Sequence, residues 1–157
     1  MHDLEHDIHP GVGIGPLRLG MDRDTVRALL GDPAREDTRD YGEGDIIHDW
    51  EYEALRLSLS FASDHEDRLS CITTEADDAT LSGEGIVGLT ETQLLETHFG
   101  DLGPPVLDDD FEEFGKDFLW DDENLSCWLS DGYVDSVSVM PLYDPSGDIP
   151  QWPTAEA

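Results

Sequence analysis

The chain has 157 residues, a length that suits one domain of ordinary size or two very small ones that share a core. Its 38 acidic residues face 8 basic ones, so the formal net charge is −30 at pH 7, which argues against direct contact with nucleic acid phosphates. No stretch approaches the roughly 20 consecutive apolar residues that a membrane-spanning helix needs, so we also expect no membrane contact.

The acidic composition is typical of a protein surface adapted to high salt. Asp outnumbers Glu, and Lys116 is the only lysine. Self-repulsion among so many carboxylates weakens in concentrated salt, because the Debye length falls from roughly 10 Å at 0.1 M to 3 Å at 1 M. We therefore expect a haloadapted protein. Attraction to a basic partner and mimicry of a polyanion are the alternatives, and neither excludes the first.

The first ten residues, MHDLEHDIHP, predict a flexible acidic segment. They lack the basic stretch and the apolar run of a secretory signal, so we expect a cytoplasmic protein. His2, His6 and His9 lie there among carboxylates, a composition that could bind a transition metal loosely. A mobile acidic segment is the favoured interpretation, and no metal site is predicted.

Two short helices are predicted in corresponding places. The first spans residues 22–30, with Asp22 as its N-cap and Gly31 at its end. The second has a capping box, an apolar stripe and a terminating glycine, formed by Thr90 with Gln93, by Leu94, Leu95 and Phe99, and by Gly100. The stretches VRALLGD and LETHFGD align with an internal period of 69 residues, which indicates a duplication.

Runs of period-2 alternation follow each helix and predict antiparallel strands. They are Ile46–Tyr52, Leu55–Phe61, Arg68–Thr74, Asp117–Asp121, Leu125–Ser130 and Tyr133–Met140. The sequence therefore predicts an α+β fold of two degenerate repeats, each a short helix packed on an antiparallel meander of three or four strands. The repeats are expected over residues 11–78 and 79–142, followed by a C-terminal tail over 143–157.

Alternation also assigns side chains to the two faces of a sheet. In the strand over residues 125–130, the leucines and Cys127 point to the core. Trp128 therefore lies on the outer face, between Ser126 and Ser130. An aromatic side chain in that place is a candidate anchor for a partner.

Known catalytic and cofactor motifs are missing from the sequence. There is no phosphate loop, no hydrolase elbow and no EF-hand layout, so we predict neither an enzyme nor a bound cofactor. The acidic runs 108–113 and 121–124 are interpreted as solvated loops, with weak cation binding or docking of a basic protein as alternatives. Cys71 and Cys127 lack the spacing of a zinc site or redox pair, so we expect buried free thiols; one bridge between neighbouring strands is the alternative.

The stretch from Gly20 to Pro33, GMDRDTVRALLGDP, resembles the opening of the SmpA/OmlA (BamE-like) domain. That opening combines Gly-Met, a short helix with Val, and Leu-Gly-x-Pro. A doubled unit of this kind is similar in architecture to the secreted β-lactamase inhibitor proteins. The resemblance implies a fold that binds other proteins, commonly across a sheet face.

The leading hypothesis is a non-enzymatic protein-binding module, such as an immunity or inhibitor protein, that engages a basic partner such as a nuclease toxin. Electrostatic complementarity would accelerate encounter, and exposed aromatic side chains would supply the anchor. The residues expected at the contact are Trp128, Ser126, Ser130, Trp50, Tyr52, Asp121, Asp122 and Glu123, whereas Trp120 is favoured as core. The alternatives are a DNA mimic that occupies a nucleic-acid-binding site, and a small-ligand-binding protein that uses the cleft between the repeats.

Overall fold

The structure is a computed structural model that describes residues 7–42, 44–62, 68–97, 99–100, 102–143 and 150–151. Its helices are α1 (Arg23–Leu30) and α2 (Glu91–Glu96), with short 3₁₀ turns η1 (Glu53–Leu55) and η3 (Glu112–Phe114). Its strands are β1 (Asp7–His9), β2 (Gly13–Ile14), β3 (Leu17–Arg18), β4 (Arg35–Asp40), β5 (Ile46–Tyr52), β6 (Leu57–Ala62), β7 (Arg68–Thr74), β8 (Thr80–Leu81), β9 (Glu84–Gly85), β10 (Val106–Asp110), β11 (Lys116–Trp120), β12 (Leu125–Ser130), β13 (Tyr133–Val139), β14 (Leu142–Tyr143) and β15 (Pro150–Gln151).

The predicted α+β fold is wrong, because the protein is mainly β. Of the described residues, 50% lie in strands and 16% in helices and 3₁₀ turns. The strands form an eight-stranded sheet in the order β10-β11-β12-β13-β7-β6-β5-β4, a five-stranded sheet in the order β3-β2-β1-β8-β9, and the pair β14–β15. One long sheet thus replaces the predicted pair of helix-on-meander repeats, and the BamE-like fold that the resemblance implied is corrected with it.

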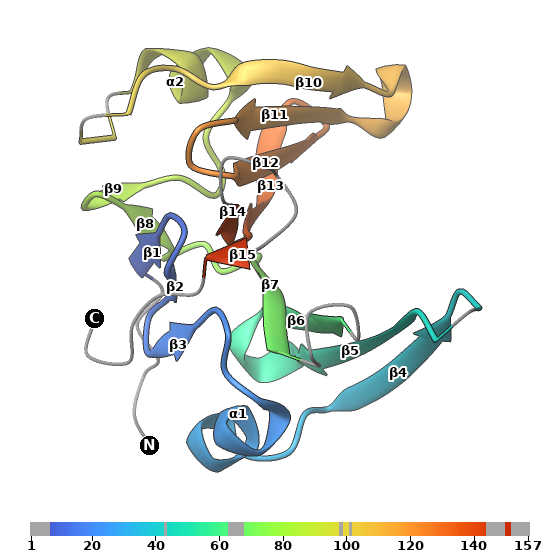
Figure 1. Cartoon of the computed structure of the whole chain (residues 1–157). Coiled ribbons are helices and arrows are strands. Elements are labelled where there is room, and N and C mark those ends of the chain that lie inside the picture. Colours follow the sequence, from blue (N-terminus) through green and yellow to red (C-terminus); the bar gives the residue numbers. More distant parts are fainter. Residues whose placement is uncertain are drawn as a thin grey trace.

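The eight-stranded sheet is continuous across the two halves of the chain. Each half contributes four consecutive antiparallel strands, and β13 pairs with β7 where the halves meet. The register there places Val137 opposite Thr74, Ser138 opposite Thr73, and Val139 opposite Ile72. In Figure 1 the outer hairpins β4–β5 and β10–β11 lie at opposite ends of the sheet and both project to the right, so the sheet curves around one of its faces.

The core lies on the other face of this sheet. Period-2 alternation sends large apolar side chains to it from every central strand, for example Leu59, Ile72, Cys127 and Val137. The two α-helices and the five-stranded sheet lie on that side, toward the left in Figure 1. Their buried side chains join the same cluster, in which the main contributors are Val26, Leu94, Ile8, Ile14, Leu17 and Leu81. Both halves of the chain therefore share one hydrophobic core.

Within the predicted flexible segment of residues 1–10, Asp7–His9 form the paired strand β1, and residues 1–6 lie outside the described residues. β1 pairs antiparallel with β2 and parallel with β8, and Ile8 is only 3% exposed. This single buried isoleucine holds an otherwise acidic stretch against the core. His2 and His6 lie outside the described residues, as does most of the predicted tail, of which β15 is described as paired with β14.

The helix starts were predicted correctly, and one helix end was not. Asp22 caps α1 by accepting a hydrogen bond from the backbone N–H of Thr25, and Gly31 ends that helix. The capping box of Thr90 and Gln93 is present at α2. However, α2 ends at Glu96, so Phe99 is buried after the helix instead of on its apolar stripe.

Three predicted strands, β5, β7 and β12, have the observed bounds. The start of β6 was placed too early, because η1 and the left-handed Arg56 (φ 54°) occupy the turn before it. β4 and β10 were missed altogether, since all their side chains are exposed and the sequence shows no apolar alternation there. Both strands form edges of the sheet, where charged side chains hinder pairing with other chains.

The two cysteines are free thiols, as predicted, and they cannot bridge in this fold. Cys127 faces the core from β12, while Cys71 lies on the opposite face of β7, and β13 runs between the two strands. Burial raises the pKa of both thiols. In the described part of the chain, no helix is long and apolar enough to cross a membrane.

Candidate functional site

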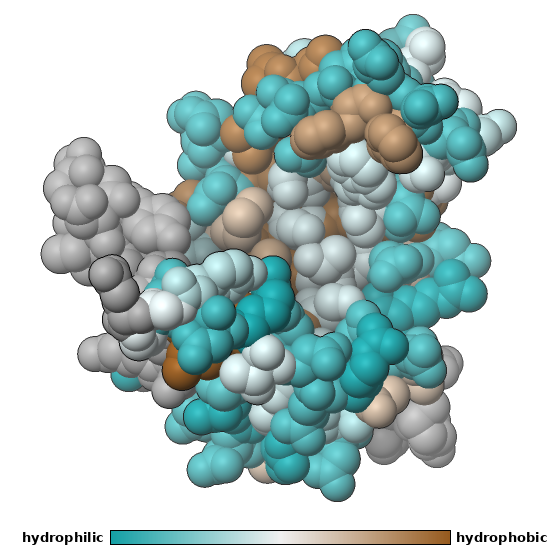
Figure 2. All heavy atoms as spheres, turned by 90° about the vertical axis from the view of Figure 1, so that its right-hand side faces the viewer, coloured by the Kyte–Doolittle hydropathy of each residue, from teal (hydrophilic) through white to brown (hydrophobic). Residues whose placement is uncertain are grey.

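The candidate site is the face of the eight-stranded sheet that points away from the core, which we call the open face. Figure 2 looks onto it: pale side chains run down its middle between hydrophilic ones, and hydrophobic atoms gather at its upper end, near β10 and β11. No described helix or strand covers this face. A sheet of this size that buries only one face leaves the other available to a partner.

Small hydroxyl side chains occupy the middle of the open face. The register aligns Ser126, Ser138, Thr73 and Ser58 across β12, β13, β7 and β6. We call these four residues the hydroxyl row. Thr73 Oγ1 and Ser138 Oγ are 2.8 Å apart, so a hydrogen bond spans the junction between the halves. Short side chains keep the backbone accessible here, and hydroxyls both donate and accept hydrogen bonds.

At the β4–β5 end, the carboxylates of the open face are neutralised within the protein. Arg39 holds Asp49 with two hydrogen bonds, of 2.5 Å from Nε and 3.0 Å from Nη2. Arg35 Nη2 donates to Glu51 at 2.5 Å. The Ser60 hydroxyl also donates to Asp49, at 2.7 Å. At this end of the face, Asp49 and Glu51 are therefore each paired with an arginine.

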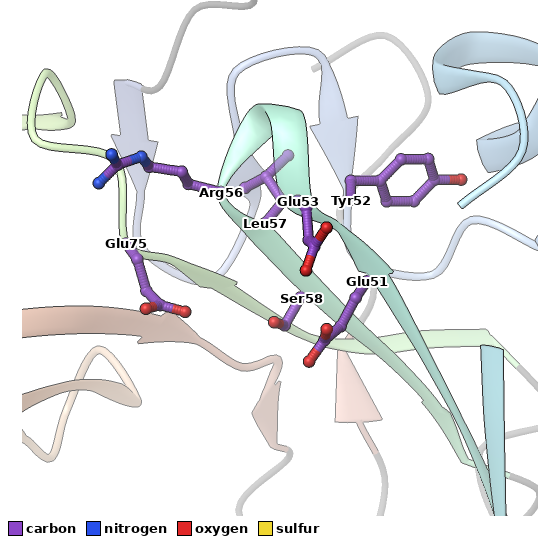
Figure 3. A pocket seen from close by; sticks show the side chains of 7 residues that line it. All are labelled: Glu51, Tyr52, Glu53, Arg56, Leu57, Ser58 and Glu75. Atoms are coloured by element: carbon purple, nitrogen blue, oxygen red, sulfur yellow. The ribbon is translucent and has the colours of Figure 1, made fainter. Parts of the chain in front are cut away.

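An acidic recess of about 270 Å³ adjoins this end of the hydroxyl row. In Figure 3, Glu51, Glu53 and Ser58 point into a common space, with Glu75 beside them. Tyr52 points away, and its hydroxyl donates to the carbonyl oxygen of Gly31 at 2.8 Å. The recess comes from the turn η1, which lifts Glu53 to the end of the face. Arg56 also lines the recess, and Glu51 is already paired with Arg35, so this recess carries charges of both signs.

Aromatic side chains form the opposite end of the open face. Trp128 is half-buried on β12, and the Phe111 ring lies 5.6 Å from it, centroid to centroid. Phe111 reaches it from the β10–β11 connection, which η3 closes with a hydrogen bond from the Phe111 N–H to the Gly115 carbonyl oxygen at 2.8 Å. Gly115 passes directly beside the Trp128 ring. The sequence thus folds this loop onto Trp128 and holds the ring in place.

Carboxylates surround Trp128 on the neighbouring strands. Asp117 of β11 lies directly opposite Trp128, and Asp109 of β10 lies opposite Asp117. Burial, together with the nearby carboxylates of Asp108 and Asp109, raises the pKa of Asp117 above its ordinary value. Neither Asp109 nor Asp117 forms an ion pair within the described residues. This negative charge is uncompensated.

The structure places the predicted contact residues in three different environments. Trp128, Ser126 and Ser130 lie together on the open face. The prediction for Trp50 and Tyr52 needs correction, because they are 3% and 5% exposed and belong to the core. The prediction correctly put Trp50 and Tyr52 on the same face of β5. It was wrong in making that face accessible, because it is the face that packs on the core. Trp120 is 4% exposed and lies in the core, as predicted.

The acidic turn of Asp121, Asp122 and Glu123 lies away from Trp128. It joins β11 to β12 at Leu125, three residues from Trp128, which corresponds to about 10 Å along the strand. The structure therefore does not bring this turn into contact with the aromatic end of the face.

Sequence reasoning missed several members of the open face. Asp117 was assigned only to a strand, and Phe111 to an acidic loop. The hydroxyls of Ser58, Thr73 and Ser138 alternate with buried apolar residues, so the pattern that identified Ser126 would have found them as well. Pairing across the halves could not be found in this way, because alternation carries no information on which strands are neighbours.

Within the part of the chain that the structure describes, no group of three or more His, Cys, Asp or Glu side chains is placed to hold a metal ion. The open face offers hydroxyls, carboxylates and one aromatic end. Comparisons of the chain with protein-family models, with curated proteins and with solved structures found no match.

Proposed function

We propose that this protein is a non-enzymatic binding module, of the immunity or inhibitor kind, whose open face engages a basic protein in the cytoplasm. The observation that carries the proposal is the curved face of the eight-stranded sheet, which no described element covers. Free cysteines, one of them on this face, are compatible with a reducing compartment.

The negative charge of this protein favours a partner with a positively charged surface. A net charge of −30 repels acidic proteins and nucleic acids, and it attracts a basic surface. Complementary charges raise association rates to about 10⁸–10⁹ M⁻¹s⁻¹ at low salt. A basic partner would therefore be captured quickly, and the contacts on the open face would decide how long it stays.

The open face suits a protein better than it suits mimicry of DNA. Its carboxylates lie toward the two ends, and the hydroxyl row separates them. Duplex DNA carries one charge per ~1.7 Å along its whole axis, so a mimic needs carboxylates along the whole face. A protein partner, in contrast, needs hydrogen-bonding groups around an anchoring aromatic side chain, and Trp128 with its serines offers both.

Site-specific photo-crosslinking in cells of the source organism tests this proposal. A photoreactive amino acid at Ser138 lies at the centre of the open face, whereas the same amino acid at Thr25 on α1 lies on the other side of the molecule. We expect one basic protein to be captured from Ser138 and to be absent from the Thr25 sample. The captured protein is then purified and bound to the unmodified chain by titration calorimetry.

Two results would contradict the proposal. One is that the photoreactive group captures nothing at Ser138 and also captures nothing at Ser130, a second position on the open face. The other is that Ser138 and Thr25 capture the same proteins with equal yield, because nonspecific attraction to an acidic surface would explain that outcome.

A further inference from the structure

The distribution of cations in the chain is strongly asymmetric. All seven arginines lie between Arg18 and Arg68, whereas residues 69–157 carry 21 acidic side chains and Lys116 alone. That lysine is not on the open face. It lies on the other face of β11 and donates to Glu91 of α2 at 2.9 Å. The second half of the open face therefore has no cation of its own within the described residues.

The first half shows what a guanidinium does on this sheet. Arg39 bridges Asp49 on the neighbouring strand with two hydrogen bonds. On the core side of the same strand, the Arg27 guanidinium lies 4.7 Å from the centre of the Trp50 ring. In the first half, therefore, an arginine of the chain hydrogen-bonds a carboxylate, and another arginine packs on a tryptophan ring.

The second half presents the same two acceptors without the arginine. Asp117 and Trp128 are directly opposite each other on β11 and β12, so their Cβ atoms lie about 4.5–5.5 Å apart. Asp109 continues the same line of residues on β10. A single guanidinium reaching this place would contact a carboxylate and an aromatic ring at once.

We propose that Trp128, Phe111, Asp117 and Asp109 form an acceptor for an arginine side chain of the basic partner. The inference rests on the proposed function, which supplies the partner, and it names the group that the partner inserts. The guanidinium would stack against the exposed part of the Trp128 ring and donate to Asp117. The partner would thereby neutralise the half of the face that the chain leaves negative.

Arginine fits this acceptor better than lysine does. Its planar, weakly hydrated guanidinium stacks on an indole ring and forms a paired set of hydrogen bonds with a carboxylate. An ammonium group is strongly hydrated and offers no flat surface to the ring. Arginine and tryptophan are also the residue types that most often dominate the binding energy of interfaces.

The test uses the full-length chain and two blocked amino acids, N-acetyl-arginine methylamide and the uncharged N-acetyl-citrulline methylamide. Each is titrated at 0.3 M salt while the indole Nε1–H resonances are recorded by NMR, with Trp128→Phe identifying the Trp128 signal. We expect the arginine compound to shift that signal saturably. The citrulline compound, which has the same shape without the charge, should shift it at least about fivefold less.

Charge-matched variants localise the effect. Asp117→Asn should weaken binding of the arginine compound about threefold or more, because it removes the carboxylate opposite Trp128. Asp122→Asn removes the same charge from the turn about 10 Å farther along the sheet, and it should change the affinity less than twofold. Equal responses to arginine and citrulline, or equal losses in the two variants, would overturn the arginine acceptor.

This test and the crosslinking experiment fail independently. Specific binding of the arginine compound with no partner captured at either Ser138 or Ser130 would overturn the proposed function and leave the acceptor standing. A captured partner that binds Asp117→Asn and Asp122→Asn equally would leave the proposed function standing and overturn the acceptor.

Discussion

At the scale of single residues, Gly115 determines whether Trp128 can occupy its place. Its φ is 140°, and an added Cβ would lie 2.3 Å from the Leu129 carbonyl oxygen and 2.6 Å from Trp128 Cζ2. We expect Gly115→Ala to lower the free energy of unfolding by about 1–3 kcal/mol and to displace the ring. Thermal unfolding measures the loss. Gly103→Ala, where no atom lies within 4 Å, is the matched control and should be close to neutral.

Asp117 is predicted to weaken the fold at neutral pH. Because its pKa is raised in the folded protein, the folded state binds the proton more tightly than the unfolded state does. The contribution of Asp117 to stability is therefore greatest below its ordinary pKa, and it is lost as the pH rises through the raised value. Asp117→Asn should raise Tm at pH 7 by about 1–3 °C, and this gain should shrink toward pH 4.

The control for this measurement is Asp122→Asn, which removes an equal charge from an exposed turn. A purely structural carboxylate would behave in the opposite way, since its removal would destabilise the protein. A lower Tm for Asp117→Asn than for the unmodified chain at pH 7 would therefore refute this account of Asp117. The carboxylates of Asp108 and Asp109 on β10 lie near Asp117 and add to the rise in its pKa.

At the scale of elements, the β7–β13 junction unites the two halves through three residue pairs. We expect Thr73 and Ser138 to couple there, because their hydroxyls hydrogen-bond across it at 2.8 Å. A double-mutant cycle of Thr73→Val and Ser138→Ala, followed by denaturant unfolding, should give a coupling free energy of about 0.5–1.5 kcal/mol. Strictly additive losses would show that the hydroxyl pair does not hold the junction.

The sequence predicts the bounds of a strand only where one face of that strand is buried. β5, β7 and β12 alternate clearly, and their bounds were predicted. β4 and β10 have no buried side chain, so only their partners hold them in the sheet, and partners are set by tertiary structure. The short strands β1 and β8 pair parallel across more than 70 residues of chain, which no local pattern encodes.

The candidate site was predictable in part for the same reason. Alternation placed Trp128 with Ser126 and Ser130 on an outer face, but it could not tell that the aromatic face of β5 is the core one. Trp50 is buried there under Arg27 and against Phe61. The link between Trp128 and Phe111 depends on how η3 folds back, which the acidic sequence of that loop does not reveal.

At the scale of the whole molecule, self-repulsion should make the protein depend on salt. A net charge of −30 is only weakly screened at 0.1 M, where the Debye length is roughly 10 Å. Raising NaCl from 0.1 M to 2 M should raise Tm by more than about 5 °C, or roughly 2 kcal/mol for a chain of this length. An uncharged osmolyte at equal osmolality serves as the control. A Tm that does not depend on salt would contradict a surface adapted to it.

We propose that a basic protein binds the open face of the eight-stranded sheet. The most direct measurement is the Kd of the partner captured from Ser138 for two variants of equal bulk, Ser138→Trp on the open face and Thr25→Trp on α1. We expect at least about a 100-fold weaker Kd for Ser138→Trp and less than a twofold change for Thr25→Trp, with the same order at 0.1 M and 1 M salt. Equal Kd values for Ser138→Trp and the unmodified chain would contradict it.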